Sequence, residues 1–219
     1  MLRSIALAGA VMALASCSGK LPKIALLDLS ALLPSRPDAT PVPTFALYDG
    51  AISARVATGY CADPAASRPS QGFAIFASCV SLGVEDAAPV IPAIITVQVA
   101  GLDTAAVSAD PTAFMAVVSG DAGPTLLSRA GDAASITMGA TDVVDDFVTV
   151  TFADAAPSDI AGLQPEQWRG FGDLAGRLVT LSVRGFLEQR LSDARGTAIL
   201  ARTIAGFDAA NTSNIPTDP

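Results

Sequence analysis

Histidine is absent from this chain of 219 residues, and lysine occurs only at Lys20 and Lys23. Without histidine, the usual general base, the commonest metal ligand and the Ser-His and Cys-His pairs of nucleophilic enzymes are excluded. A serine–lysine pair would have to operate close to the N-terminus, away from the body of the chain. We therefore expect a protein that is not an enzyme and has no cofactor and no metal site.

Charged residues make up only 16% of the chain and aromatic residues only 5%, whereas 51% of the residues are hydrophobic. This composition disfavours intrinsic disorder, and the length fits one domain with a real core. The 21 acidic residues outnumber the 13 basic ones, which gives a net charge of −8. Since such a protein can replace few phosphate counterions, nucleic acid is not an expected partner.

Residues 1–16 have the layout of a secretory signal, with Arg3 followed by an uncharged apolar stretch. The stretch ends in Leu14-Ala15-Ser16-Cys17, which resembles the lipobox of bacterial lipoproteins. The resemblance implies cleavage before Cys17 and acylation of this residue, although an ordinary signal with a chance cysteine is the alternative. Ser18 stands where aspartate would mark inner-membrane retention, so we expect a lipid anchor in the outer membrane, facing the periplasm.

Residues 17–43 are predicted to form the lipid anchor and a proline-rich tether. The apolar segment 24–33 is too short to span a bilayer and could lie on the membrane or pack back onto the domain. The prolines that follow it impose an extended, semi-rigid spacer. We expect the folded domain over residues 44–210 and a flexible tail over 211–219.

Cys61 and Cys79 form an even pair in an oxidising compartment, which predicts a disulfide. Two buried free thiols are the alternative. A simple hairpin of residues 52–60 with 72–79 would place Cys61 opposite the start of the second strand. A bridge to Cys79 therefore needs a different strand arrangement, because the two Cα atoms must lie within about 7 Å.

Apolar runs and alternating patterns predict strands over 51–60, 72–80, 91–99, 135–138, 146–152 and 177–186. The runs 72–80 and 91–99 are apolar almost throughout, which indicates strands covered on both faces. Strands of this number, with turns between them, favour an antiparallel sheet.

Asp110-Pro111 is typical of a helix start, and a second short helix is expected over 125–130. Residues 165–168 indicate a helical turn. Leu200, Ile204 and Phe207 recur at helical spacing within 192–209, although a hairpin turning at 193–196 is the competing interpretation. The pattern predicts an α+β single domain, with about six antiparallel strands and helices on one face; an all-β sandwich is the alternative.

Several short motifs are spread over the body of the chain: Gly59-Tyr60-Cys61-Ala62-Asp63-Pro64, Ser67-Arg68, Cys79, Ser128-Arg129-Ala130-Gly131-Asp132, Trp168-Arg169 and Gly176-Arg177-Leu178-Val179-Thr180-Leu181-Ser182-Val183. Together they resemble a group of alphaproteobacterial envelope proteins of unknown function. The resemblance covers most of residues 50–210 and implies one α+β domain, but no activity.

Basic residues are unevenly distributed. Residues 24–165 hold 4 arginines against 15 acids, whereas 166–219 hold 6 arginines against 6 acids. These late arginines either pair with acids of the same chain or form a face for an anionic partner, such as an envelope protein or an anionic glycan. The candidates for that face are Arg169, Arg177, Arg184 and Arg195.

The remaining candidates for catalysis or metal binding are two pairs of adjacent acidic residues, Glu85-Asp86 and Asp145-Asp146. Asp142 could join the second pair around calcium, but the spacing of a calcium loop is missing, so a solvated turn is the better interpretation. We therefore expect a non-catalytic, outer-membrane-anchored lipoprotein that acts as a binding or assembly module. A carrier of a small apolar or lipidic ligand is the alternative, and a carboxylate-dependent enzyme is the third possibility.

Overall fold

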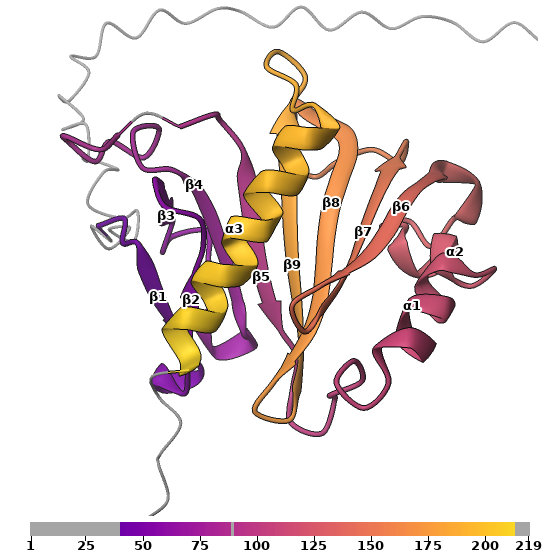
Figure 1. Cartoon of the computed structure of the whole chain (residues 1–219). Coiled ribbons are helices and arrows are strands. Elements are labelled where there is room, and N and C mark those ends of the chain that lie inside the picture. The colour runs from indigo at the N-terminus through magenta and orange to yellow at the C-terminus, as the bar shows by residue number, and fades with distance from the viewer. Residues whose placement is uncertain (1–39, 89, 213–219) are drawn as a thin grey trace, which may run out of the picture. The chain divides into compact units, whose positions relative to one another are not determined.

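The structure is a computed structural model that describes residues 40–88 and 90–212. Seven strands form an antiparallel sheet in the order β3-β4-β5-β9-β8-β7-β6, and β1 and β2 form a separate hairpin (Figure 1). The predicted α+β class and antiparallel sheet are confirmed. The strands are β1 (Thr44–Leu47), β2 (Ile52–Arg55), β3 (Tyr60–Ala62), β4 (Phe73–Ser78), β5 (Ile94–Val99), β6 (Ile136–Val144), β7 (Phe147–Asp154), β8 (Leu163–Leu174) and β9 (Arg177–Phe186); the α-helices are α1 (Pro111–Ser119), α2 (Gly123–Leu127) and α3 (Asp193–Thr212), and single 3-10 turns occupy Tyr48–Gly50, Pro69–Gln71 and Ala133–Ser135.

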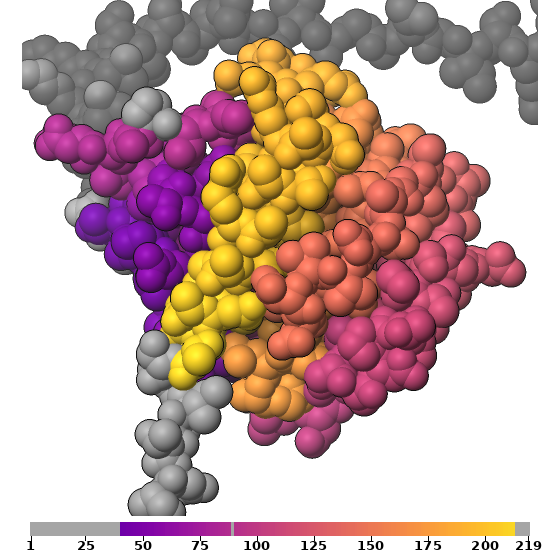
Figure 2. Space-filling view, in the orientation of Figure 1, coloured from indigo at the N-terminus to yellow at the C-terminus, as the bar shows by residue number. Residues whose placement is uncertain are grey.

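The C-terminal helix α3 covers the middle of one sheet face. Its apolar stripe, which includes Leu200, Ile204 and Phe207, is buried in one cluster with Val179 and Leu181 of β9. The expected closing helix is therefore present, and the competing hairpin is not. Figure 2 shows α3 running as a continuous ridge between the indigo β1–β2 region and the orange β6–β7 region.

Helices α1 and α2 lie over β6 and β7 on the opposite face of the sheet. Asp110 caps α1 as predicted, because its side chain accepts a hydrogen bond of 2.9 Å from the amide of Ala113. The two helices bury Val150 and Phe152 of β7, whereas the intervening Thr151 lines a small space beneath α3. Since alternate residues of a strand point to opposite faces, the helices are divided between two faces rather than gathered on one.

The N-terminal hairpin packs beside α3 on the same face. The expected strand 51–60 is divided, because the chain turns after β2 and rejoins the main sheet as β3. Asn211 in α3 is buried and its side chain bonds both the amide and the carbonyl of Ser53. At the other end of the domain, the carbonyl of Val42 accepts a bond from the amide of Ala62. These two contacts lie just outside the expected domain limits of 44 and 210.

Residues 165–168 do not form the expected helical turn but belong to β8, which pairs with β7 and β9. The strand pattern is hidden in the sequence because Gln164 and Gln167 are buried polar residues of this strand. Gln164 is satisfied by the backbone of Leu191, whose amide donates to Oε1 at 2.7 Å.

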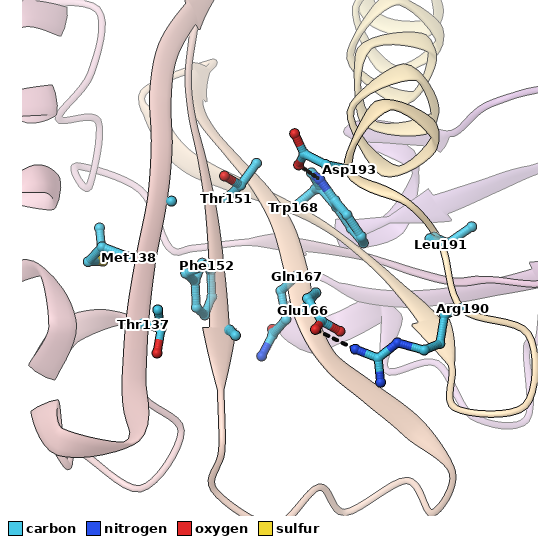
Figure 3. Close-up of a pocket in the computed structure, with 12 residues that line it drawn as sticks. Thr137, Met138, Thr151, Phe152, Glu166, Gln167, Trp168, Arg190, Leu191 and Asp193 are labelled. Atoms are coloured by element: carbon cyan, nitrogen blue, oxygen red, sulfur yellow. Dashed lines mark hydrogen bonds and ion pairs between the residues drawn. The ribbon is translucent and has the colours of Figure 1, made fainter.

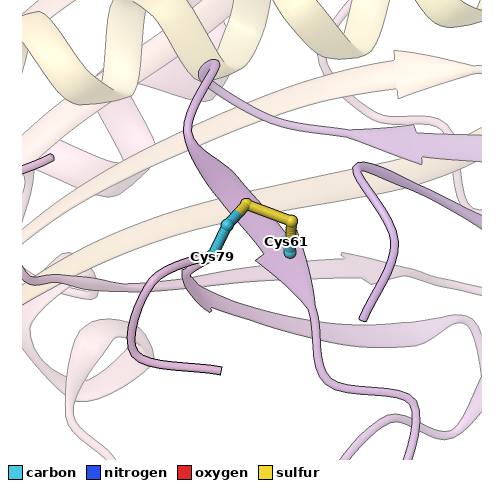
Figure 4. The surroundings of a disulfide bond; sticks show 2 residues. All are labelled: Cys61 and Cys79. Carbon is cyan, nitrogen blue, oxygen red and sulfur yellow. A yellow bond between two sulfur atoms is a disulfide. The ribbon is translucent and has the colours of Figure 1, made fainter. Parts of the chain in front are cut away.

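A disulfide joins Cys61 and Cys79, with a Cα–Cα distance of 4.9 Å (Figure 4). The division of the expected strand explains how the pair meets. Cys61 lies in β3 and pairs with Ala77 of β4, and Cys79 directly follows that strand. The two cysteines are therefore near neighbours across adjacent strands.

The expected signal at 1–16, most of the expected tether, Cys17 and residues 213–219 lie outside the described residues. Within residues 40–88 and 90–212, no helix has both the length and the apolar character needed to cross a membrane.

Candidate functional site

In the part of the chain that the structure describes, no α-helix packs on the sheet face opposite α3 over β4, β5 and β9. Burial alternates along these strands, so that Phe76 and Ile95 are fully buried while Ile75 and Ile94 are partly exposed. The expectation that 72–80 and 91–99 are covered on both faces is therefore wrong. The physical reason is that α1 and α2 pack over β6 and β7, at the other end of the sheet.

The strand register arranges the outward residues of this face in rows. Because neighbouring partners lie directly opposite one another, their side chains form one continuous surface. We call these ten residues the open face: Phe73, Gln98 and Thr180 in one row, Ile75, Thr96, Ser182 and Arg169 in the next, and Ile94, Arg184 and the buried Gln167 in the third. None of the ten is acidic, although acids outnumber bases in the chain.

Arg169 of β8 is anchored on the open face by neutral groups. Its Nε donates to Ser182 Oγ at 3.3 Å and its Nη2 donates to Gln167 Oε1 at 3.4 Å. Its Cζ lies 4.9 Å from the centre of the Phe152 ring, within the range of a cation–π contact. Among the described residues, no carboxylate comes within ion-pair distance of Arg169.

Arg184 of β9 is anchored in the same way. Its Nη1 donates to Ser158 Oγ at 3.1 Å and its Nη2 donates to the carbonyl of Gln164 at 3.0 Å. Its Nε is buried and has no hydrogen-bond partner within the described part of the chain. A buried donor without an acceptor lowers the stability of the fold, so this atom calls for a structural explanation.

Asp154, at the end of β7, is the nearby acid that acts on both arginines. Its carboxylate accepts bonds from Ser135 Oγ at 2.8 Å, from the Ala156 amide at 2.9 Å and from the Arg129 amide at 3.1 Å. Although burial acts to raise the pKa of Asp154, these hydrogen bonds lower it overall. Asp154 therefore fixes the backbone at Arg129 and at Ala156. The guanidinium of Arg129 is paired with Asp159 instead.

Burial and neighbouring cations lower the pKa values of both arginines. Burial and then the neighbouring Arg184 lower the pKa of Arg169 to about 10, while Asp154 acts in the opposite direction. Burial and then Arg129 lower the pKa of Arg184. A base whose pKa falls on folding costs stability at every pH below that pKa, so both charged groups oppose folding at neutral pH.

The other two predicted arginines lie elsewhere. Arg177, at the start of β9, has its Cζ 4.5 Å from the centre of the Tyr48 ring and donates to the carbonyl of Ala100. Arg195 is exposed on α3, across the sheet from the open face. The structure thus brings together Arg169 and Arg184 but not Arg177 or Arg195.

A groove of about 370 Å³ opens beside the start of α3 (Figure 3). Trp168 donates from Nε1 to Asp193 at 2.9 Å, and Glu166 forms an ion pair with Arg190. Each acid of the groove thus already has a partner, although Oε2 of Glu166 is buried without one among the described residues. Beneath α3 itself, the space lined by Thr151, Leu200 and other residues measures only about 30 Å³, which is roughly the share of one water molecule.

The acidic neighbours singled out from the sequence lie in turns. Asp145 and Asp146 connect β6 to β7, and Glu85 and Asp86 are exposed between β4 and β5. Within the described ranges, no group of three acidic, cysteine or histidine side chains could hold a metal ion.

The open face itself was not expected from the sequence. One signal for it is present, because Thr96 and Gln98 interrupt the apolar run of β5 at a spacing of two. Thr180 and Ser182 repeat this pattern in β9. Polar residues at alternate positions indicate a face that is less buried than its opposite.

The chain matches no protein-family model, no curated protein and no solved structure.

Proposed function

We propose that this chain is a non-catalytic lipoprotein, anchored through Cys17 in the outer membrane, whose periplasmic domain binds a partner through the open face. The observation that carries this proposal is the open face itself. It combines partly exposed apolar side chains, such as Ile75 and Ile94, with two arginines that have no carboxylate within ion-pair distance in the described residues. Exposed apolar area rimmed by polar groups is typical of an interaction surface.

The charge of this surface favours an anionic partner, either an envelope protein or an anionic glycan. The body of the chain is acidic, with 4 arginines against 15 acids over residues 24–165. A locally basic face on an acidic domain orients an approaching anionic molecule. The acidic remainder of the surface repels the same molecule, so binding is favoured at the open face. Hydroxyl groups of Thr96, Thr180 and Ser182 add hydrogen-bonding capacity between the strands.

In-cell photo-crosslinking tests this proposal. A photoreactive residue in place of Thr96, at the centre of the open face, should give a defined adduct in intact cells. The matched control replaces Ala205, which is exposed on α3. Adducts from position 205 but none from 96 would contradict the proposal, as would equal and diffuse labelling at both positions.

A carrier of a small apolar ligand is the second candidate, favoured by the groove beside α3. The groove is lined by Met138, Phe152, Trp168 and Leu191, and Trp168 is the only tryptophan of the chain. A ligand in this groove should therefore change the tryptophan fluorescence. Titration with a medium-chain fatty acid checks this, and an unchanged spectrum would count against the groove.

A further inference from the structure

We propose that Arg169 and Arg184 form a binding site for one phosphate group on the open face. This inference rests on the proposed function only in taking that face as the binding surface. The register pairs Arg169 with Ser182 and Arg184 with Gln167, so that the two arginines are diagonal neighbours on adjacent strands. Diagonal neighbours lie about 7–8 Å apart, a distance that two long guanidinium side chains can bridge toward one ligand.

The donors of the two guanidinium groups are largely unused. Each guanidinium carries five N–H donors, and each of these two makes only two hydrogen bonds to the described residues. Nε of Arg184 is buried without a partner among these residues. A tetrahedral oxyanion on the open face could accept from the remaining N–H groups of both guanidiniums at once, whereas the buried Nε of Arg184 lies out of its reach.

The side chains that hold the two arginines are neutral, and the nearby acid Asp154 acts on both without forming an ion pair with either. Ser182, Gln167 and Ser158 hold them through oxygen atoms, and the oxygens of Asp154 are occupied by other donors. Both cations carry lowered pKa values, yet with its pKa at about 10 Arg169 is charged at neutral pH. Placing two such cations together opposes folding, and a site built for an anion explains the arrangement.

Phosphate suits this site better than a carboxylate. A phosphate monoester carries a charge of about −1.5 to −2 near neutral pH, which matches two guanidinium groups, whereas a carboxylate matches one. The group could belong to a soluble phosphorylated compound or to the phosphomonoester headgroup of phosphatidic acid. The flanking Ile94 and Ile75 would then lie against the remainder of the ligand.

Titration of the purified full-length chain with inorganic phosphate tests the site. Calorimetry in detergent at constant ionic strength should show saturable binding, and Arg169→Gln or Arg184→Gln should weaken it at least tenfold. Arg195→Gln, on the far side of the sheet, is the matched control and should bind as the parent does. Thermal melts and the intact disulfide verify folding, and Arg184→Lys should retain part of the affinity if charge is what matters.

Phosphate binding that is absent, or that survives both glutamine substitutions, would overturn the site. Vesicle flotation then separates the two sources, with the Cys17→Ala chain and vesicles of phosphatidylcholine with or without phosphatidic acid. Flotation that depends on phosphatidic acid and on Arg169 indicates a headgroup, whereas phosphate binding without flotation indicates a soluble compound. An adduct from position 96 despite failed phosphate binding would refute this site and leave the proposed function standing.

Discussion

Asp208 of α3 is a residue whose charge works against the fold. Burial raises its pKa above the ordinary 3.8, and the negative charges of Asp145 and Asp146 raise it further. An acid whose pKa is raised on folding destabilises the folded state when ionised, and this cost disappears as the pH falls through the raised pKa. The cost is therefore fully present at pH values above the raised pKa.

Asp208→Asn should accordingly stabilise the protein at pH 7, by about 0.5 kcal/mol once solvent screening is allowed for. The gain over the parent should shrink as the pH is lowered toward 3.8, the ordinary value for aspartate. Denaturant melts at a series of pH values measure this difference. Asp121→Asn, in an exposed turn, should change little at any pH; a destabilised Asp208→Asn would refute the charge argument.

At the scale of the element, α3 approaches the sheet closely at its first turn. A Cβ on Gly196 would lie 2.1 Å from Cδ2 and Cε2 of the Trp168 ring, and this ring is itself held by Asp193. Glycine in a helix ordinarily costs about 1 kcal/mol relative to alanine. The close contact with Trp168 should instead make alanine the less stable residue at position 196.

Gly196→Ala is therefore expected to destabilise the domain by about 1–3 kcal/mol through overpacking. Thr197→Ala, at the next and exposed position, should be neutral or slightly stabilising. Thermal unfolding of both variants gives the comparison. A higher melting temperature for Gly196→Ala would show that α3 lies farther from β8 than described.

The buried stripe of α3 gives a second prediction at this scale. Ile204 has no exposed surface and packs in the cluster that contains Val179 and Leu181. Ile204→Asp should destabilise the domain by more than about 3 kcal/mol, because an unpaired charge would enter the core. The exposed Arg202→Ala should cost within about 0.5 kcal/mol. A soluble, cooperatively melting Ile204→Asp chain would show that α3 is dispensable.

Elements with a clean period could be predicted from the sequence, and elements whose pattern depends on distant partners could not. The strand at 177–186 and the Leu200-Ile204-Phe207 helix appear with the expected types because apolar spacing alone specifies them. The strand β8 was missed because Gln164 is buried and satisfied only through Leu191, far along the chain. No local pattern in the sequence indicates such a distant partner.

For the whole molecule, the open face could not be predicted because coverage is a property of the assembled sheet. The apolar runs of β4 and β5 are compatible with burial on one face or on two, and only the positions of α1, α2 and α3 decide which. Charge distribution did single out Arg169 and Arg184 as surface candidates. The sequence could not show that Arg177 and Arg195 lie away from this pair, because their positions depend on the strand register and on the path of the chain.

The anchor is the part of the proposal that concerns the molecule's location. Wild-type protein should fractionate with the outer membrane, and its intact mass should correspond to a chain that begins at an acylated Cys17. Cys17→Ala should abolish lipidation and release the mature chain from that fraction, because the acyl chains supply the attachment. An entirely soluble wild-type protein with an unmodified Cys17 would contradict the assignment.

The central claim is that the basic open face recruits an anionic partner, and the most direct measurement is the charge dependence of crosslinking in cells. The yield of the adduct formed from position 96 should fall at least tenfold when Arg169→Gln and Arg184→Gln are combined. It should be unchanged by Arg195→Gln, which removes one positive charge from the opposite side of the sheet. An undiminished yield from a folded double variant would contradict the claim.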